Sequence, residues 1–168
     1  MAVKSIVTYP DPILKAVCSP VVTVDRNVLQ LIEDLIDTMH AGPGSVGVAA
    51  PQIGVALRAC VIDVSKNRHG KDNNHGLLRM INPEIVERSG SAVMREGCMS
   101  VPDYTGDVER ATNLTLRFTE PEGAVREFAA SGFEAVAIQH EMDHLDGLLF
   151  LDRISSLKTG LFRRKSYK

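Results

Sequence analysis

The 168-residue chain contains 19 basic and 21 acidic side chains, which give a formal net charge of −2 at pH 7. With 44% hydrophobic and 24% charged residues, the composition excludes a disordered chain and predicts one domain, residues 1–168, with a core of its own. The nearly balanced charge gives no reason to expect DNA or a membrane as a partner.

The N-terminal region and the cysteines both point to the cytoplasm. The first residues, MAVKSIVTYPDPILKAV, lack the apolar stretch of a secretory signal. The three cysteines, Cys18, Cys60 and Cys98, are odd in number and far apart. Such cysteines make a poor disulfide framework and suit a reducing compartment better. We therefore expect a cytoplasmic protein.

The first half of the chain predicts a helix followed by a buried strand. Apolar residues recur at helical spacing in TVDRNVLQLIEDLIDTMHAG, where Thr23 or Asp25 can cap the start and Gly42 can end the helix. Residues 56–64, ALRACVIDV, are nearly all apolar, which is typical of a strand buried on both faces. Residues 66–76 are polar and rich in glycine and asparagine, so they predict a loop.

The second half predicts a hairpin and a second helix. Residues 114–118 and 124–130 have strand character and flank the turn sequence TEPEG. In SGFE, Ser131 and Glu134 match a capping box for the following helix. Gly147 is a natural residue to end that helix.

This second helix carries an H-E-x-x-H pattern made by His140, Glu141 and His144. The two histidines continue an apolar stripe, so they face inward one turn apart, as two ligands of one ion must. The alternative is a helix with two satisfied core histidines and a solvent-exposed carboxylate. Two histidines at this spacing, with the glutamate between them, favour the metal site.

The third ligand is predicted to come from upstream in the sequence. Phe150 stands where one class of metallopeptidases has its last histidine, and the 24 residues after His144 contain no glutamate, histidine or cysteine. Cys98, in the short segment REGCMSVP, can complete a set of one cysteine and two histidines. The other upstream candidates are better explained as solvated histidines or small buried cysteines: His40, His69, His75, Cys18 and Cys60.

Three segments together resemble the signature motifs of peptide deformylases: SVGVAAPQ (45–52), EGCMS (96–100) and QHEMDHLDG (139–147). They occur in the same order, and the resemblance extends over nearly the whole chain. It implies an α+β fold of the deformylase kind, with small antiparallel or mixed β-sheets around a central metal-binding helix. The implied activity is that of a metal-dependent amidohydrolase, which removes the N-formyl group from the initiator methionine of nascent chains.

The resemblance also implies roles for individual residues. Cys98, His140 and His144 would bind the metal, and Glu141 would shuttle the proton. Gln52 and the backbone N–H of Met99 would stabilise the oxyanion. The alternative for Gln52 is an amide that caps the turn after Pro51. The expected substrate contacts are Ser45, Val46, Gly47 and Glu96, with residues 46–50 pairing along an extended peptide.

The resemblance allows more than one metal, and two positions depart from the family pattern. Relatives of this kind typically use Fe²⁺, which Ni²⁺, Co²⁺ or Zn²⁺ can replace, although sulfur and nitrogen ligands also suit zinc on general grounds. Ser45 stands where the family usually has glycine, and Thr105 where many bacterial relatives have an arginine near the substrate. Arg110 matches a frequent family position and can support the metal site through Glu96. The departures leave a second hypothesis, a metal-binding protein with little catalysis; a true endopeptidase is the third.

The C-terminal segment LKTGLFRRKSYK is strongly basic. It contains five positive side chains: Lys158, Arg163, Arg164, Lys165 and Lys168. A solvated, frayed terminus is one explanation. The other is a weak contact with the RNA phosphates of the ribosome, from which nascent formyl-peptides emerge.

Overall fold

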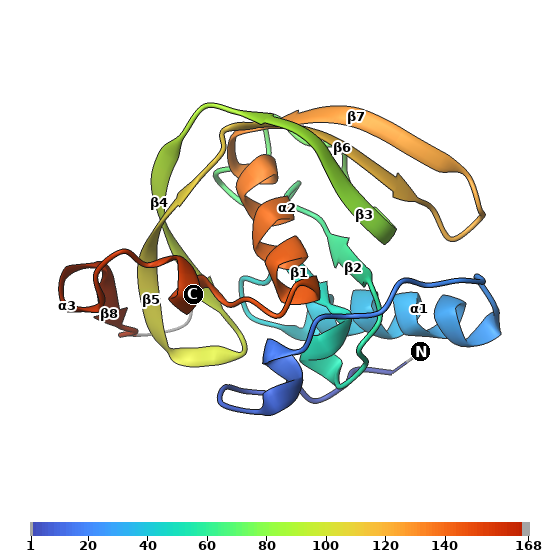
Figure 1. Ribbon diagram of the computed structural model, residues 1–168, viewed down its shortest axis with the longest axis horizontal. Helices are drawn as coiled ribbons and strands as arrows, with labels where there is room; N and C mark the ends of the chain where they lie inside the picture. Colours follow the sequence, from blue (N-terminus) through green and yellow to red (C-terminus); the bar gives the residue numbers. More distant parts are fainter. Residues whose placement is uncertain (1, 166–168) are drawn as a thin grey trace.

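Helix α2 (Gly132–Leu145) runs through the middle of the molecule, and antiparallel strands arch around it (Figure 1). The computed structural model describes residues 2–165. A five-stranded sheet has the order β1-β2-β3-β6-β7 and a three-stranded sheet has the order β4-β5-β8. The α+β fold predicted from the sequence, with small sheets around a central helix, is thereby confirmed.

The five-stranded sheet consists of β1 (Gly47–Ala49), β2 (Ala59–Ile62), β3 (Leu78–Ser89), β6 (Asn113–Thr119) and β7 (Val125–Ser131). The smaller sheet consists of β4 (Ala92–Cys98), β5 (Val101–Arg110) and β8 (Leu161–Arg163). The predicted hairpin is the β6–β7 pair, which is in register from Asn113↔Ser131 to Thr119↔Val125. The predicted buried strand is β2, whose four residues are all buried.

The remaining helices connect and cover the sheets. They are α1 (Arg26–Ala41), the short α3 (Leu157–Gly160), and the 3₁₀ turns η1 (Pro12–Lys15), η2 (Ala50–Ile53) and η3 (Phe150–Arg153). Of the two candidate caps for α1, Asp25 takes the role, because its Oδ1 accepts from the backbone N–H of Val28 at 3.0 Å. The apolar face of α1 packs on β1 and β2.

The capping box predicted for α2 is wrong. Ser131 occupies the N-cap position, but its side chain makes no capping bond; its hydroxyl accepts from Asn73 instead, at 2.9 Å. The carboxylate of Glu134 accepts from the backbone N–H of His75 at 2.7 Å and contacts its ring at 2.6 Å. Both side chains are thus used to hold the loop 66–76. Gly147, with φ of 76°, follows the helix end as predicted.

Helix α2 is buried over most of its surface. One face packs with the five-stranded sheet in the main core, and α1 with β1 and β2 forms a second cluster. A third cluster joins η1, η3 and the small sheet, and it includes Cys98 and Phe150. No helix in residues 2–165 is long and apolar enough to cross a membrane. Because α2 is closely packed on most sides, its side chains are held in fixed positions, and so is any ligand that they bind.

Candidate metal centre and active site

Three potential metal ligands converge where α2 meets the end of β4. His140 and His144 lie one turn apart on α2, and Cys98 is the last residue of β4. One ligand atom from each residue lies within 4.8 Å of the other two, and Cys98 Sγ is 3.4 Å from His144 Nε2. An ion about 2.0–2.3 Å from each donor fits this spacing. The three residues can therefore hold a single metal ion.

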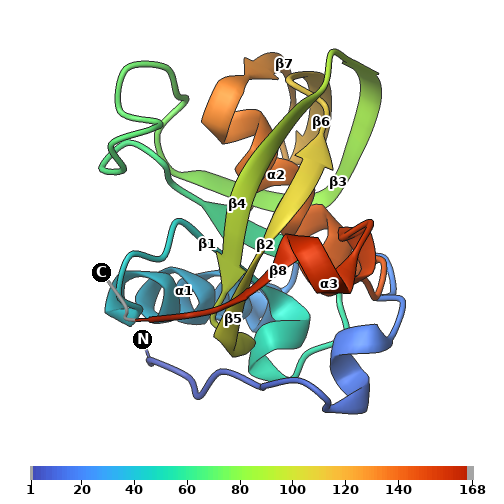
Figure 2. The same ribbon diagram turned by 90° about the vertical axis from the view of Figure 1, so that its left-hand side faces the viewer.

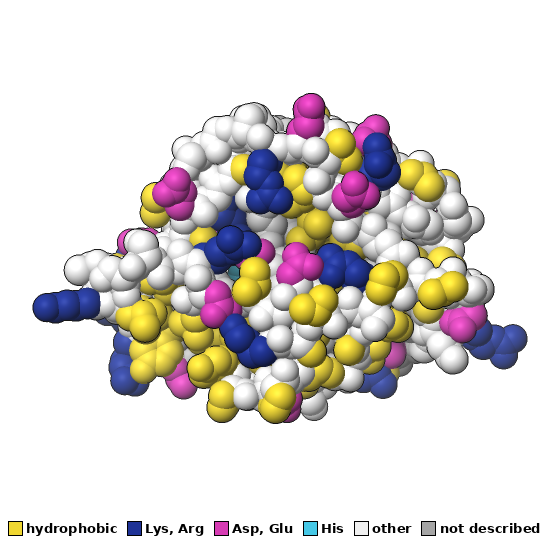
Figure 3. Space-filling model, viewed as in Figure 1, with side chains coloured by type: hydrophobic (Ala, Val, Ile, Leu, Met, Phe, Trp, Pro, Cys, Tyr) yellow, Lys and Arg dark blue, Asp and Glu magenta, His cyan; other side chains and the backbone are white. Residues whose placement is uncertain are grey.

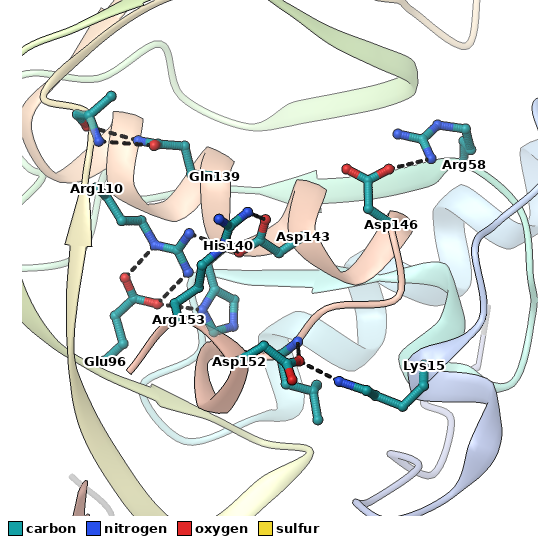
Figure 4. Close-up of polar contacts among 12 residues, drawn as sticks. Lys15, Arg58, Glu96, Arg110, Gln139, His140, Asp143, Asp146, Asp152 and Arg153 are labelled. Carbon is teal, nitrogen blue, oxygen red and sulfur yellow. Dashed lines mark hydrogen bonds and ion pairs between the residues drawn. The ribbon is translucent and has the colours of Figure 1, made fainter. Parts of the chain in front are cut away.

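A buried ionic network orients His140 (Figure 4). Its Nδ1 lies 2.9 Å from Glu96 Oε1, which leaves Nε2 to face the centre. Arg110 donates to both Glu96 oxygens, at 2.6 and 2.9 Å, and to Asp143 at 2.9 Å. Asp143 also accepts two hydrogen bonds from Arg153. The pairing of Arg110 with Glu96 predicted from the sequence is confirmed.

The network also determines the charge of its members. Burial opposes ionisation of Glu96, but hydrogen bonds from His140 and Arg110 outweigh it and lower the pKa of Glu96 to about 2. Arg110, Asp143 and Arg153 also line a second hollow in the surface. Figure 3 shows basic and acidic side chains close together on this face of the molecule. The negative charge of Glu96 is therefore paired with Arg110 and His140 and does not face a substrate.

Glu141 is buried beside the ligands. Its Oε1 has no hydrogen-bond partner among residues 2–165, and burial raises its pKa to about 7. A Cβ at Gly47 would lie 2.7 Å from Oε2, so the glycine in β1 leaves the space that this carboxylate occupies. A buried carboxylate oxygen without a protein partner is suited to a water or ligand atom in the site. This observation fits a metal centre with a water beside it.

Gln52 reaches the centre from the η2 turn. Its amide nitrogen donates to Cys98 Sγ at 3.4 Å and to Ser100 Oγ at 3.1 Å. Its oxygen accepts from the backbone N–H of Ala49 at 3.0 Å. Gln52 therefore stabilises the η2 turn through Ala49 and also places its NH₂ group beside the metal ligand Cys98. Met99 lies in the turn after Cys98.

A cleft of about 230 Å³ opens in front of these groups. Its lining includes the residues expected to contact substrate: Ser45, Val46, Gly47 and Glu96. Apolar side chains missed by the sequence analysis add to it: Met94, Phe133, Val136 and Ala137. For Phe133, Val136 and Ala137, the sequence indicated only that they lie on the inward-facing apolar stripe of the helix. Arg164 from the basic tail also lines the cleft, which no sequence pattern indicated.

The other upstream candidates for the third ligand lie elsewhere. Cys18 and Cys60 are buried in the main core, and burial raises the pKa of both thiols. His75 is paired with Glu134, His69 lies against Phe133, and His40 is exposed at the end of α1. Within the described part of the chain, the group of Cys98, His140 and His144 is the one with metal-binding spacing.

Fold and site together define a metal-dependent hydrolase, with two histidines and a cysteine around one point and a carboxylate beside them. Comparison with known proteins makes the assignment specific. The profile of the family described as Polypeptide deformylase matches residues 3–160. The chain belongs to this family, whose members remove the N-formyl group from newly synthesised polypeptides.

Individual relatives agree over the full length. The chain is 41% identical to the peptide deformylase of Syntrophobacter fumaroxidans over 165 residues, or 98% of this chain and 94% of the relative. It is 45% identical to the peptide deformylase of Bartonella tribocorum over 169 residues, which cover 100% of this chain and 93% of the relative.

Solved structures lead to the same family. The peptide deformylase of Legionella pneumophila has a TM-score of 0.84 at 39% identity, with 94% of this chain and 89% of that chain covered. The enzyme of Ehrlichia chaffeensis in complex with actinonin has a TM-score of 0.87 at 36% identity, with 94% and 92% covered. Each of the two matches covers 94% of this chain.

Proposed function

We propose that this chain hydrolyses the formamide bond of N-formylmethionyl peptides and releases formate. The observation that carries the proposal is the convergence of Cys98, His140 and His144 beside the buried carboxylate of Glu141. A divalent ion bound by the three ligands would lower the pKa of a water molecule and supply hydroxide near neutral pH.

Glu141 is assigned the proton transfer. It follows His140 directly on α2, and its Oε1 lacks a partner among the described residues. A carboxylate in that place can accept the proton of the attacking water and donate it to the methionine nitrogen. The water oxygen bonds to the formyl carbon, the C–N bond breaks, and formate and a free amino terminus result.

Gln52 and the backbone N–H of Met99 are assigned to the oxyanion of the tetrahedral intermediate. The NH₂ group of Gln52 is held beside Cys98 by the bonds to Ser100 and Ala49, so it needs little rearrangement to act as a donor. Met99 adjoins the same ligand in the chain. Preorganised donors of this kind are typically worth about 10²–10³-fold in kcat.

The cleft suits an extended peptide. We assign Ser45, Val46 and Gly47 to its backbone by strand addition at the start of β1. The Ser45 hydroxyl donates to the carbonyl of Gly47 at 3.3 Å, so the side chain that departs from the family's glycine lies along this segment. The sequence predicts Glu96 as a substrate contact, but its carboxylate contacts His140 and Arg110, so we assign it to positioning His140.

We infer Fe²⁺ as the native ion, with Ni²⁺, Co²⁺ and Zn²⁺ as possible substitutes. One thiolate and two imidazoles are compatible with each of these ions, and the choice of iron rests on the family resemblance. Metal analysis of protein purified without oxygen tests it. Stoichiometric zinc together with full activity would overturn the inference.

The activity is tested by formate release from formyl-Met-Ala by the Fe²⁺-loaded protein, with acetyl-Met-Ala as the control substrate. Rapid, formyl-specific release supports the proposal. A fully loaded protein that does not turn over would instead support a metal-binding protein with little catalysis. Casein cleavage at a comparable rate would favour an endopeptidase.

We also propose a cytoplasmic location, where nascent chains are made, and a weak ribosome contact through the basic tail. Of its five basic residues, Lys168 lies outside the described part of the chain. Lys158, Arg163 and Lys165 are exposed. Changing these three to glutamate should reduce ribosome co-sedimentation at low salt, because the contact would be electrostatic, and leave turnover of a free formyl-peptide unchanged. Equal co-sedimentation of the unmodified protein and the triple variant would contradict the proposed ribosome contact.

A further inference from the structure

The N-terminal segment, residues 6–9, connects two parts of the active site. It runs along the lower edge of the molecule in Figure 2, below the turn that joins β4 and β5. The backbone N–H of Val7 donates to the carbonyl of Gln52 at 2.7 Å. Two residues further on, the backbone N–H of Tyr9 donates to the carbonyl of Ser100 at 2.8 Å. The N-terminal segment therefore bridges η2 and the turn between β4 and β5.

Two neighbouring side chains of the N-terminal segment pack into different core clusters. Ile6 packs against the cluster of α1, β1 and β2, and Met99 packs against the same cluster. Val7 packs against the third cluster, which contains the metal ligand Cys98. Because the segment is packed against both clusters, the positions of its two N–H donors are fixed relative to the site.

A buried side-chain hydrogen bond joins the same two parts of the site directly. The amide nitrogen of Gln52 donates to Ser100 Oγ at 3.1 Å, and the two residues are only 2% and 0% exposed. The two groups assigned to the oxyanion belong to these parts, because Gln52 lies in η2 and Met99 lies in the turn beside Ser100. The spacing of the two donors therefore depends on how η2 is held against the turn. Both the N-terminal segment and the bond between Gln52 and Ser100 hold it there.

We propose that the N-terminal segment is a positioning element for the oxyanion donors and acts through Gln52 and Ser100. This inference rests on the proposed deformylase function. Such donors stabilise the oxyanion only where their N–H groups match its position in the transition state, and small displacements lower the rate steeply. Loosening η2 against the turn should therefore lower kcat, while KM for the peptide and the metal content stay unchanged.

The first test removes one N–H donor of the N-terminal segment. Val7→Pro lacks the N–H that binds the carbonyl of Gln52, and it keeps an apolar side chain. With the metal-loaded protein and formyl-Met-Ala, kcat should fall about 10-fold at unchanged KM, a smaller loss than removal of a whole oxyanion donor causes. Val3→Pro is the matched control, because Val3 is 63% exposed, and it should keep the kcat of the unmodified protein.

A double-variant comparison separates positioning from a purely structural role. In a Gln52→Ala background the amide is absent, so Val7→Pro should lower kcat no further. Ser100→Ala removes the acceptor of the amide, so it should also lower kcat about 10-fold when Gln52 is present and not when Gln52 is absent. Its matched control is Ser91→Ala, because the Ser91 hydroxyl donates to the exposed Glu109 at 2.7 Å. This control should leave kcat unchanged in both backgrounds.

Hydrogen exchange of the Gln52 side-chain amide, followed by NMR in the zinc-loaded protein, gives a readout that needs no turnover. Exchange should be faster in Val7→Pro than in Val3→Pro, because the amide is held less firmly. Equal exchange in the two variants, or the same loss of kcat with and without Gln52, would overturn the inference. If Val7→Pro does not fold, Val7→Ala, which loosens the packing beside Cys98, replaces it in both measurements. Turnover of formyl-Met-Ala by the unmodified protein separately tests the deformylase function.

Discussion

Replacing Arg110 with methionine should destabilise the protein strongly and weaken its hold on the metal. The side chains of Arg110, Glu96 and Asp143 are only 4%, 6% and 9% exposed. Methionine has a similar volume but removes three hydrogen bonds and the positive charge between two carboxylates. Asp143 keeps Arg153 as a partner, whereas the one side-chain partner left to Glu96 among residues 2–165 is the ring of His140.

The magnitude follows from the burial of Glu96. Removing one partner of a buried ion pair typically costs about 3–5 kcal/mol, because the remaining charge is left uncompensated. A typical free energy of unfolding is about 5–15 kcal/mol, so the loss is a large share of the total. Because Glu96 also orients His140, metal affinity should fall by about 10–100-fold.

Urea unfolding of the metal-free protein measures the first effect, and competition with a chelator measures the second. Arg117→Met is the matched control, since Arg117 is 45% exposed and pairs with Glu127 on the surface; it should cost less than about 1 kcal/mol. The double variant Arg110→Met/Glu96→Gln should recover part of the stability, because the unpaired carboxylate is gone. If Arg110→Met unfolds at the same urea concentration as Arg117→Met, the argument from burial is refuted.

Further substitutions test other parts of the site and the fold. Glu141→Ala should keep stoichiometric metal and lose about 10²–10⁴-fold in kcat, since its proposed role is proton transfer; a metal-free variant or near-normal turnover would show the role to be wrong. Cys98→Ser should bind metal weakly, because a hydroxyl ionises far less readily than a thiol, and elemental analysis of the purified variant checks it. Gly147→Ala should destabilise more than Gly54→Ala, both being at positive φ. The left-handed conformation costs each about 1–2 kcal/mol, but a Cβ at Gly147 would also lie 2.5 Å from the carbonyl oxygen of Lys15, whereas at Gly54 nothing lies within 4 Å. Equal urea midpoints for the two alanine variants would contradict this reasoning.

Features that depend on residues close together in the chain could be predicted from the sequence. His140 and His144 share a helix, so their separation of four residues already determines that they face the same point. The β6–β7 hairpin and the Asp25 cap likewise depend on neighbours in the chain. The third ligand, Cys98, could not be predicted from α2 alone, because it lies on a strand far from α2 in sequence. It was predicted by excluding the other candidate ligands and by the resemblance to the family motifs.

Tertiary structure decided the features in which distant segments compete for the same groups. The capping box failed because the loop 66–76 provides other partners for Ser131 and Glu134. Arg164 could be assigned only to a basic tail, since its place beside Gly97 depends on the pairing of β8 with β5, more than fifty residues apart in sequence. A helix sets the spacing of its own side chains through local backbone geometry, whereas the partner of a strand is chosen by packing across the whole fold.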